Sequence, residues 1–116
     1  MLRKKQEKPI KKTDKELWVL IEEQIKNHTY LFLPHAKKRQ KDRNISDIDV
    51  LEILENKNKC KRQRNKRKDS YTEGFTDWNY CIESLAIEGE NKIRIIISFA
   101  ELHLLIVTVI RLDNLE

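Results

Sequence analysis

The aliphatic stretch of residues 93–110 constrains the fold more than any other feature of this 116-residue sequence. An arginine, a glutamate and a histidine interrupt it, whereas a membrane-spanning helix needs about 20 largely uncharged residues in a row. Alternating apolar side chains instead predict two β-strands, residues 92–99 and 103–112, joined by a tight turn at residues 100–101. So apolar a hairpin needs helices to cover one of its faces.

The pairing within this hairpin decides which side chains enter the core. A two-residue turn predicts Ser98 opposite His103 and Arg94 opposite Val107. Because side chains alternate along a strand, one face is then apolar and must pack under helices. That face comprises Ile93, Ile95, Ile97, Phe99, Leu104, Ile106 and Ile110. The opposite face comprises Arg94, Ser98, His103 and Arg111 among aliphatic residues.

Helical spacing and capping residues predict the remaining elements. We expect helices at about 14–27, 35–43 and 46–55, strands at 30–33 and 80–87, and an edge strand or mobile arm within 59–71. Tyr80 or Glu83 would join the charged face of the sheet, according to the register of the 80–87 strand. The sequence therefore predicts an α+β domain, with two to three helices packed on one face of a small antiparallel sheet of three to five strands. Residues 1–12 would be a disordered basic arm, and residues 13–116 a single domain.

Positive charge is concentrated in two segments. Residues 1–12 hold six of the 24 lysines and arginines with one acid, and residues 57–68 hold eight with none. The rest of the chain has 10 cations against 18 acids, although the net charge is +5. Such clusters attract phosphate-bearing partners, while a solvated loop or a site for an acidic protein are the alternatives. The expected nucleic-acid-binding residues are Lys37, Lys38, Lys59, Lys61, Arg62, Arg64, Lys66, Arg67 and Lys68.

The cysteines and the first residues exclude several classes of protein. Cys60 and Cys81 have neither zinc-ligand spacing nor the pattern of a disulfide framework. The chain opens with charge and lacks the apolar region of a signal peptide. We therefore expect a cytoplasmic protein with no metal, no small-molecule cofactor and no membrane partner.

A histidine and two arginines at helical spacing are the candidate catalytic residues. His35, Arg39 and Arg43 share one face of the predicted polar helix. An imidazole can accept the proton of a ribose 2′-hydroxyl, and guanidiniums stabilise the charge on a pentacovalent phosphate. Arg94 and Tyr80 would complete the set from the sheet, where an aromatic ring can stack a base. By spacing alone, a solvated basic helix with internal ion pairs fits as well.

The motif around this helix resembles that of a family of small bacterial proteins grouped with the RelE/ParE toxin superfamily. His-Ala-x-x-Arg-x-x-x-Arg-x-Ile-Ser is matched by His35, Ala36, Arg39, Arg43, Ile45 and Ser46, and the resemblance covers residues 29–112 through the Val-Thr-Val of the last strand. It implies a RelE-like fold and the toxin component of a toxin–antitoxin system, a metal-independent mRNA endoribonuclease held in check by a small acidic antitoxin. Only His35, Arg39 and Arg43 carry over from the motif.

Two other functions fit the same residues. One is a non-enzymatic nucleic-acid-binding module, whose affinity falls steeply with salt but which releases no cleaved product. The other is a protein-interaction domain whose basic segments dock an acidic partner, since a fold alone does not fix its function.

Overall fold

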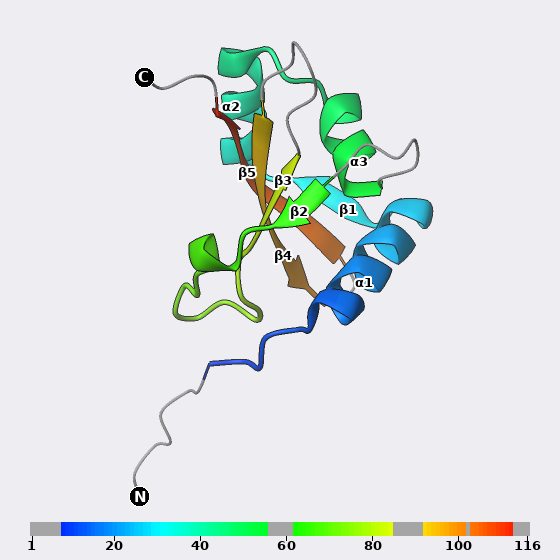
Figure 1. Ribbon diagram of the computed structural model, residues 1–116, viewed down its shortest axis with the longest axis vertical. Coiled ribbons are helices and arrows are strands. Elements are labelled where there is room, and N and C mark those ends of the chain that lie inside the picture. The colour runs from blue at the N-terminus through cyan, green and yellow to red at the C-terminus, as the bar shows by residue number, and fades with distance from the viewer. Residues whose placement is uncertain (1–7, 56–61, 85–91, 102, 113–116) are drawn as a thin grey trace, which may run out of the picture.

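The computed structural model of the chain describes residues 8–55, 62–84, 92–101 and 103–112. These residues form three α-helices, one turn of 3₁₀ helix and five strands (Figure 1). In chain order they are α1 (Asp14–Lys26), β1 (Tyr30–Phe32), α2 (Pro34–Arg43), α3 (Asp47–Glu55), β2 (Arg62–Arg64), η1 (Lys66–Lys68), β3 (Tyr80–Ser84), β4 (Lys92–Ala100) and β5 (His103–Leu112). None of these helices is long and apolar enough to cross a lipid bilayer.

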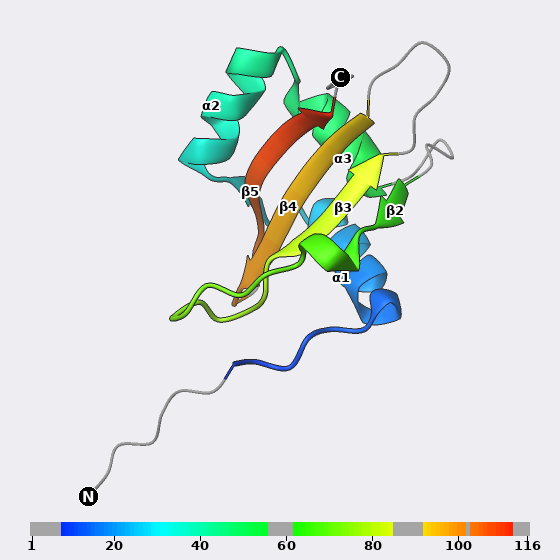
Figure 2. The same cartoon turned by 60° about the vertical axis from the view of Figure 1, so that its left-hand side comes forward.

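The five strands form one sheet in the order β1-β5-β4-β3-β2. Strands β2 to β5 are antiparallel to their neighbours, whereas β1 pairs in parallel with β5, so the sheet is mixed rather than wholly antiparallel. In Figure 2, α1 and α3 lie behind the sheet, and α2 lies beside β5 beyond the end of β1. The predicted α+β class, and β2 as an edge strand, are confirmed.

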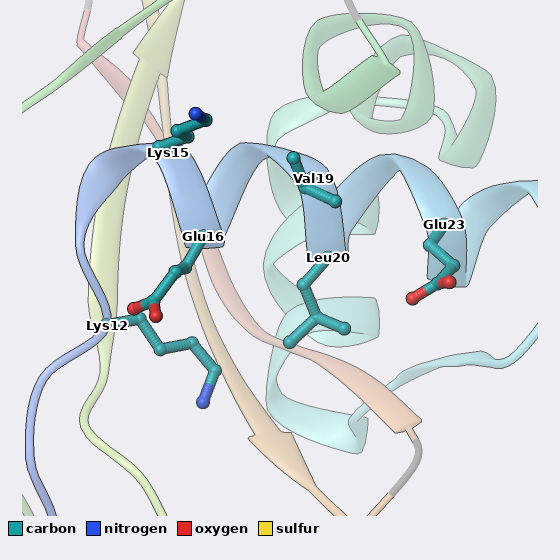
Figure 3. A pocket seen from close by; sticks show the side chains of 6 residues that line it. All are labelled: Lys12, Lys15, Glu16, Val19, Leu20 and Glu23. Atoms are coloured by element: carbon teal, nitrogen blue, oxygen red, sulfur yellow. The ribbon is translucent and has the colours of Figure 1, made fainter.

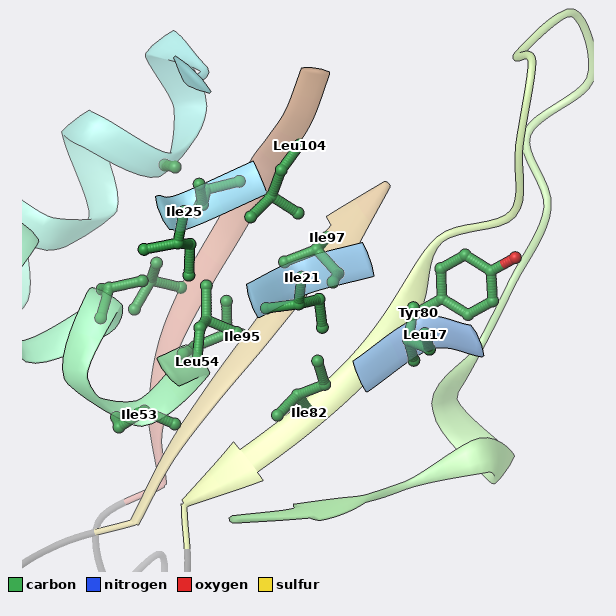
Figure 4. Packing of buried hydrophobic residues seen from close by; sticks show 14 of the residues in the cluster. Leu17, Ile21, Ile25, Ile53, Leu54, Tyr80, Ile82, Ile95, Ile97 and Leu104 are labelled. Atoms are coloured by element: carbon green, nitrogen blue, oxygen red, sulfur yellow. The ribbon is translucent and has the colours of Figure 1, made fainter. Parts of the chain in front are cut away.

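The core lies between the sheet and the pair of helices α1 and α3. Ile21 of α1 and Leu54 of α3 point toward Ile82, Ile95 and Ile97 of the sheet (Figure 4), and all five are completely buried. Fully burying one such aliphatic side chain contributes about 1.5–3 kcal/mol. This alternating apolar face therefore fixes which side of the sheet receives the helices. We call the other side the open face.

The hairpin of β4 and β5 closes later than we expected. Ala100 lies opposite His103, and Ser98 lies opposite Leu105 rather than His103. Glu101 follows with a left-handed backbone, φ 57°, at the turn. The predicted register is therefore wrong by two residues, because β4 continues as a strand through Ala100.

A β-bulge at Val107 interrupts the pairing of β4 with β5. The alternation of β5 reverses beyond it, since an extra residue turns the following side chains to the other face. Val109 is therefore fully buried, and Ile110, which we expected in the core, lies on the open face. Arg111, expected on the open face, turns to the helix side, where its Nη2 donates to the carbonyl oxygen of Arg43 at 2.8 Å.

The end of the N-terminal arm, residues 8–12, packs against the domain instead of extending freely. The indole Nε1 of Trp78 donates to the carbonyl oxygen of Pro9 at 2.7 Å. Two lysines of the arm form ion pairs of 3.0 Å with Asp69 and Asp77, whose side chains are almost completely buried. The prediction of disorder is therefore wrong for residues 8–12, because these lysines neutralise carboxylates that the fold has removed from water. Residues 1–7 lie outside the described residues.

Candidate functional site

Helix α2 presents one face to β5 and one flank to the helix layer. Pro34 occupies its first turn, and Asn44 ends it in the left-handed conformation. Ala36 and Gln40 are buried toward the sheet. The Nζ of Lys37 lies 2.8 Å from a carboxylate oxygen of Asp47, the first residue of α3. The flank of α2 that carries Lys37 therefore faces α3.

The opposite flank of α2 faces the side of the open sheet. Each residue of a helix advances by about 100°, so Arg39 lies as far to one side of the buried pair as Lys37 lies to the other. His35, Arg39 and Arg43, which we call the α2 row, are all exposed. Their side chains make no hydrogen bond or ion pair with any residue that the structure describes. The α2 row therefore offers two unpaired arginines and an exposed histidine on the flank of α2 that points away from α3.

A second row of side chains crosses the open face at right angles to the strands. Gln63 lies opposite Glu83, Glu83 opposite Arg94, and Arg94 opposite Ile110. Residues paired in this way project from the same face of a sheet. We call these four residues the cross-sheet row. It ends at β5, beside the C-terminal end of α2, where Arg111 contacts the carbonyl of Arg43.

Arg94 and Glu83 form the charged centre of the cross-sheet row. The Nε of Arg94 donates to Oε2 of Glu83 at 2.8 Å. Asn65 donates to the same oxygen from its Nδ2 at 2.8 Å, and the Nζ of Lys92 lies 3.8 Å from Oε1. Burial acts to raise the pKa of the Glu83 carboxyl, but the hydrogen bonds from Asn65 and Arg94 prevail and hold that pKa below its usual value. Glu83 is therefore a buried carboxylate in its ionised form.

The far end of the open face is covered by the loop before β3. Ser98, next to the hairpin turn, is 1% exposed, and its hydroxyl donates to the carbonyl oxygen of Trp78 at 2.8 Å. Cys81 on β3 is also buried, and burial, aided by the charge of Glu83, raises the pKa of its thiol to about 11. Among the described residues, the accessible part of the open face is therefore the end that carries Arg94.

Tyr80 does not share a face with Arg94. It lies opposite Ile97 on the helix side of the sheet and is completely buried. Its hydroxyl donates to Oδ1 of Asp77 at 2.7 Å, and burial raises the pKa of the phenol. The expectation that Tyr80 joins the cationic residues is wrong, because the register of β3 places Glu83 there instead.

Arg62, in the second basic segment, is held inside the fold. Its guanidinium lies 4.0 Å from the centre of the Trp18 ring, and it also contacts the carbonyl of Leu54 and the carboxylate of Glu22. Only 7% of its side chain is exposed, and burial lowers its pKa. The expectation that Arg62 grips a phosphate is therefore wrong, because α1 and α3 supply its partners.

Arg64 also spends its hydrogen-bond donors on partners within the fold, through all three of its guanidinium nitrogens. Its Nη1 and Nη2 donate to the two carboxylate oxygens of Asp69 at 3.0 and 2.6 Å, and its Nε donates to Asp14 at 3.1 Å. Burial acts to lower the pKa of Arg64, but its hydrogen bonds to Asp69 raise it overall. With 7% of the side chain exposed, Arg64 stabilises the fold and is not available to nucleic acid.

The other predicted nucleic-acid-binding residues differ in their exposure and in whether they form ion pairs within the protein. Lys38 on α2 and the three cations of η1 (66–68) are exposed, although Nζ of Lys66 lies 3.4 Å from Asp14. Lys37 is paired with Asp47 on the flank of α2 that faces α3, so we no longer count it among the nucleic-acid-binding residues. Lys59 and Lys61 lie outside the described residues.

Neither row lines the groove that runs beside the first turns of α1. That shallow groove, of about 480 Å³, runs along the outer side of the helix past Lys12, Glu16, Val19 and Leu20 (Figure 3). Among the described residues, no group of three or more His, Cys, Asp or Glu side chains is placed to hold a metal ion. The candidate site is therefore an exposed cationic surface.

Glu83 and Asn65 are the site residues that the sequence reasoning did not assign. The signal for Glu83 was one acid within the apolar strand YCIES, where an ionised side chain requires a partner. Asn65, between two basic residues, carried no comparable signal.

This α+β domain, with cations on α2 and on the open face of its sheet, matches one family model. The chain belongs to the family described as a domain of unknown function (DUF4258), whose model matches residues 32–111. The match includes α2 and β4, and therefore both rows, but excludes α1. No curated protein and no solved structure gives a significant match to the chain.

Proposed function

We propose that this chain is a metal-independent mRNA endoribonuclease of the RelE/ParE toxin type, acting in the cytoplasm under the control of a small acidic antitoxin. The observation that carries the proposal is the α2 row, whose uncommitted arginines lie at the edge of the open face on which Arg94 stands. Cations from two elements of the fold thus border one surface, and arginines are frequent partners of nucleic-acid phosphates.

The proposed reaction is attack of a ribose 2′-oxygen on the adjacent phosphorus. The bond from the 2′-oxygen to phosphorus forms, and the bond from phosphorus to the 5′-oxygen breaks, which leaves a 2′,3′-cyclic phosphate. His35 accepts the proton of the 2′-hydroxyl, and a solvent proton reaches the departing 5′-oxygen. Arg39, Arg43 and Arg94 stabilise the extra negative charge on the phosphorane.

The acidic antitoxin would bind the same cations as the RNA. A protein rich in aspartate and glutamate complements the exposed arginines of the α2 row, and its binding would exclude the phosphodiester. The inhibitor and the substrate are therefore expected to compete.

The test is RNA cleavage by folded, partner-free protein, with a matched pair of variants on α2. Arg39→Ala should lower the cleavage rate by about 10²–10³-fold, the usual loss for one group that stabilises transition-state charge. Lys37→Ala removes the same charge from the flank that faces α3 and should leave the rate nearly unchanged. Absence of cleavage by wild-type protein, or equal losses in both variants, would contradict the proposal.

One observation favours a non-enzymatic nucleic-acid-binding module as the second candidate. His35 is exposed, and no described side chain hydrogen-bonds to its ring and orients it. A proton acceptor in a nuclease is normally held in place by such a partner. Under this alternative, RNA binds to the same two rows, its affinity falls with salt, and no cyclic phosphate appears.

A further inference from the structure

Arg94 differs from Arg62 and Arg64 in how many of its guanidinium nitrogens form hydrogen bonds within the protein. Its Nε donates to Glu83, whereas its Nη1 and Nη2 make no hydrogen bond with any described residue. Its side chain is 21% exposed, compared with 7% for Arg62 and for Arg64. Arg64, by contrast, uses Nε and both Nη nitrogens within the protein. The terminal edge of the Arg94 guanidinium is thus available to a ligand.

The carboxylate that holds Arg94 is itself fixed from the other side. Oε2 of Glu83 accepts hydrogen bonds from the Nε of Arg94 and from the Nδ2 of Asn65, both at 2.8 Å. The Glu83 side chain is 5% exposed. Burial of a carboxylate costs several kcal/mol, and apolar replacements of buried ion pairs are often as stable or more stable. A structural role alone would therefore not require this pair in the middle of the open face.

We propose that Glu83 is a positioning residue, which holds Arg94 by its Nε so that Nη1 and Nη2 together bind one phosphate of single-stranded RNA. A planar guanidinium suits bidentate recognition of phosphate, and fixing its Nε orients that edge in advance. Lys92, 3.8 Å from Glu83, leaves the group with a net positive charge. This role rests on the proposed function, because it names how that same surface holds its substrate.

The direction in which Glu83→Gln changes the affinity for RNA distinguishes a positioning role of Glu83 from a general effect of its charge. Glu83→Gln removes a negative charge, so a simple charge effect would tighten the binding of RNA. If Glu83 orients Arg94, the same variant should weaken binding by about tenfold, close to the loss of one charge-assisted hydrogen bond. Asp47→Asn, which removes a carboxylate from the helix side, should not weaken binding.

The experiment is titration of the full chain with a short single-stranded 2′-O-methyl RNA, whose blocked hydroxyl prevents cleavage. We expect weaker binding for Glu83→Gln in the wild-type background and no further loss when it is added to Arg94→Ala. Glu83→Gln binding as tightly as wild type, or weakening binding equally in both backgrounds, would overturn the role of Glu83. Thermal unfolding of each variant confirms that it is folded.

A second measurement distinguishes failure of this inference from failure of the proposed function. The Nε–H signal of Arg94 in a ¹⁵N–¹H spectrum should exchange slowly with water in wild type and rapidly in Glu83→Gln. If that change occurs but wild type binds no 2′-O-methyl RNA, the phosphate ligand, and with it the proposed function, is wrong. If the signal does not respond to the substitution, Glu83 does not hold Arg94.

Discussion

The arginines of β2 and those of α2 both come from basic stretches of sequence, but those of β2 are buried and paired whereas those of α2 are exposed. Arg62 and Arg64 are 7% exposed and bind acids from α1 and from the loop after η1. Arg39 and Arg43 are exposed and bind no described side chain. Arg62 and Arg64, although they lie in the denser cluster, are thus less available than Arg39 and Arg43. Cation density in a sequence therefore does not measure charge offered to a partner, because the neutralising acids lie elsewhere in the chain.

Removing the acid that holds Arg64 should produce the largest effect in this comparison. Asp69, with a 1% exposed side chain, accepts from Arg64, from the backbone nitrogen of Cys81 and from Lys11. Asp69→Ala should lower the free energy of unfolding by about 3–5 kcal/mol, because a buried guanidinium loses its partner. Urea denaturation measures this loss. Lys37→Ala breaks an exposed pair and should cost less than about 1 kcal/mol, so a similar cost for both variants would remove the distinction.

Low pH should destabilise the fold through the buried carboxyl of Asp69. Burial acts to raise the pKa of Asp69, but the hydrogen bonds from Arg64, from Cys81 and from Lys11 hold it below the usual value. A pKa lowered by folding stabilises the protein above the unfolded value, about 3.9 for aspartate, and this stabilisation is lost as the pH falls further. Unfolding free energies should therefore be similar at about pH 7 and pH 5 and decline below about pH 4. A weaker decline in Asp69→Asn would assign the effect to this residue, and an equal decline would exclude it.

The salt dependence of RNA binding tests the α2 side of the comparison. Each phosphate contact on a single strand contributes about 0.7 to the slope of log affinity against log salt. Arg39→Ala combined with Arg43→Ala should therefore reduce that slope by about 1.4. Lys37→Ala should leave it unchanged. An unchanged slope in the double variant would mean that the exposed arginines do not contact the nucleic acid.

The smallest expected effect is on the stability of the α2 variants. Arg39→Ala and Arg43→Ala should each change the free energy of unfolding by less than about 0.5 kcal/mol, since neither side chain has a described partner to lose. Urea denaturation checks this too. A loss above 1 kcal/mol would mean that these arginines support the fold, as those of β2 do.

The fold class followed from the sequence because periodicity is a local property. The apolar alternation of β4 and the capping residue Thr13 of α1 were both visible in the chain. The register was not, because the bulge at Val107 depends on how two strands meet, and it exchanged the faces expected for Ile110 and Arg111.

The candidate site was predicted only in part. The α2 row and Arg94 were identified from spacing and chemistry. Arg94 lies on the open face, and the α2 row lies on the flank of α2 opposite Lys37. The burial of Arg62 and Arg64 depends on acidic partners 5 to 50 residues away in sequence, and no local pattern reveals such partners. Tyr80 was assigned to the wrong face because the loop between β3 and β4 hid the register, and Glu83 took its place.

The strand order has a consequence for the time at which the sheet can be completed during synthesis. β1 pairs with β5, so that Tyr30 lies opposite Leu104, and β5 also pairs with β4, which carries Arg94. During translation, β1 leaves the ribosome well before β5 has been synthesised. Contacts between segments so distant in sequence form slowly. A nascent chain therefore cannot complete the sheet that carries Arg94 before β5 emerges.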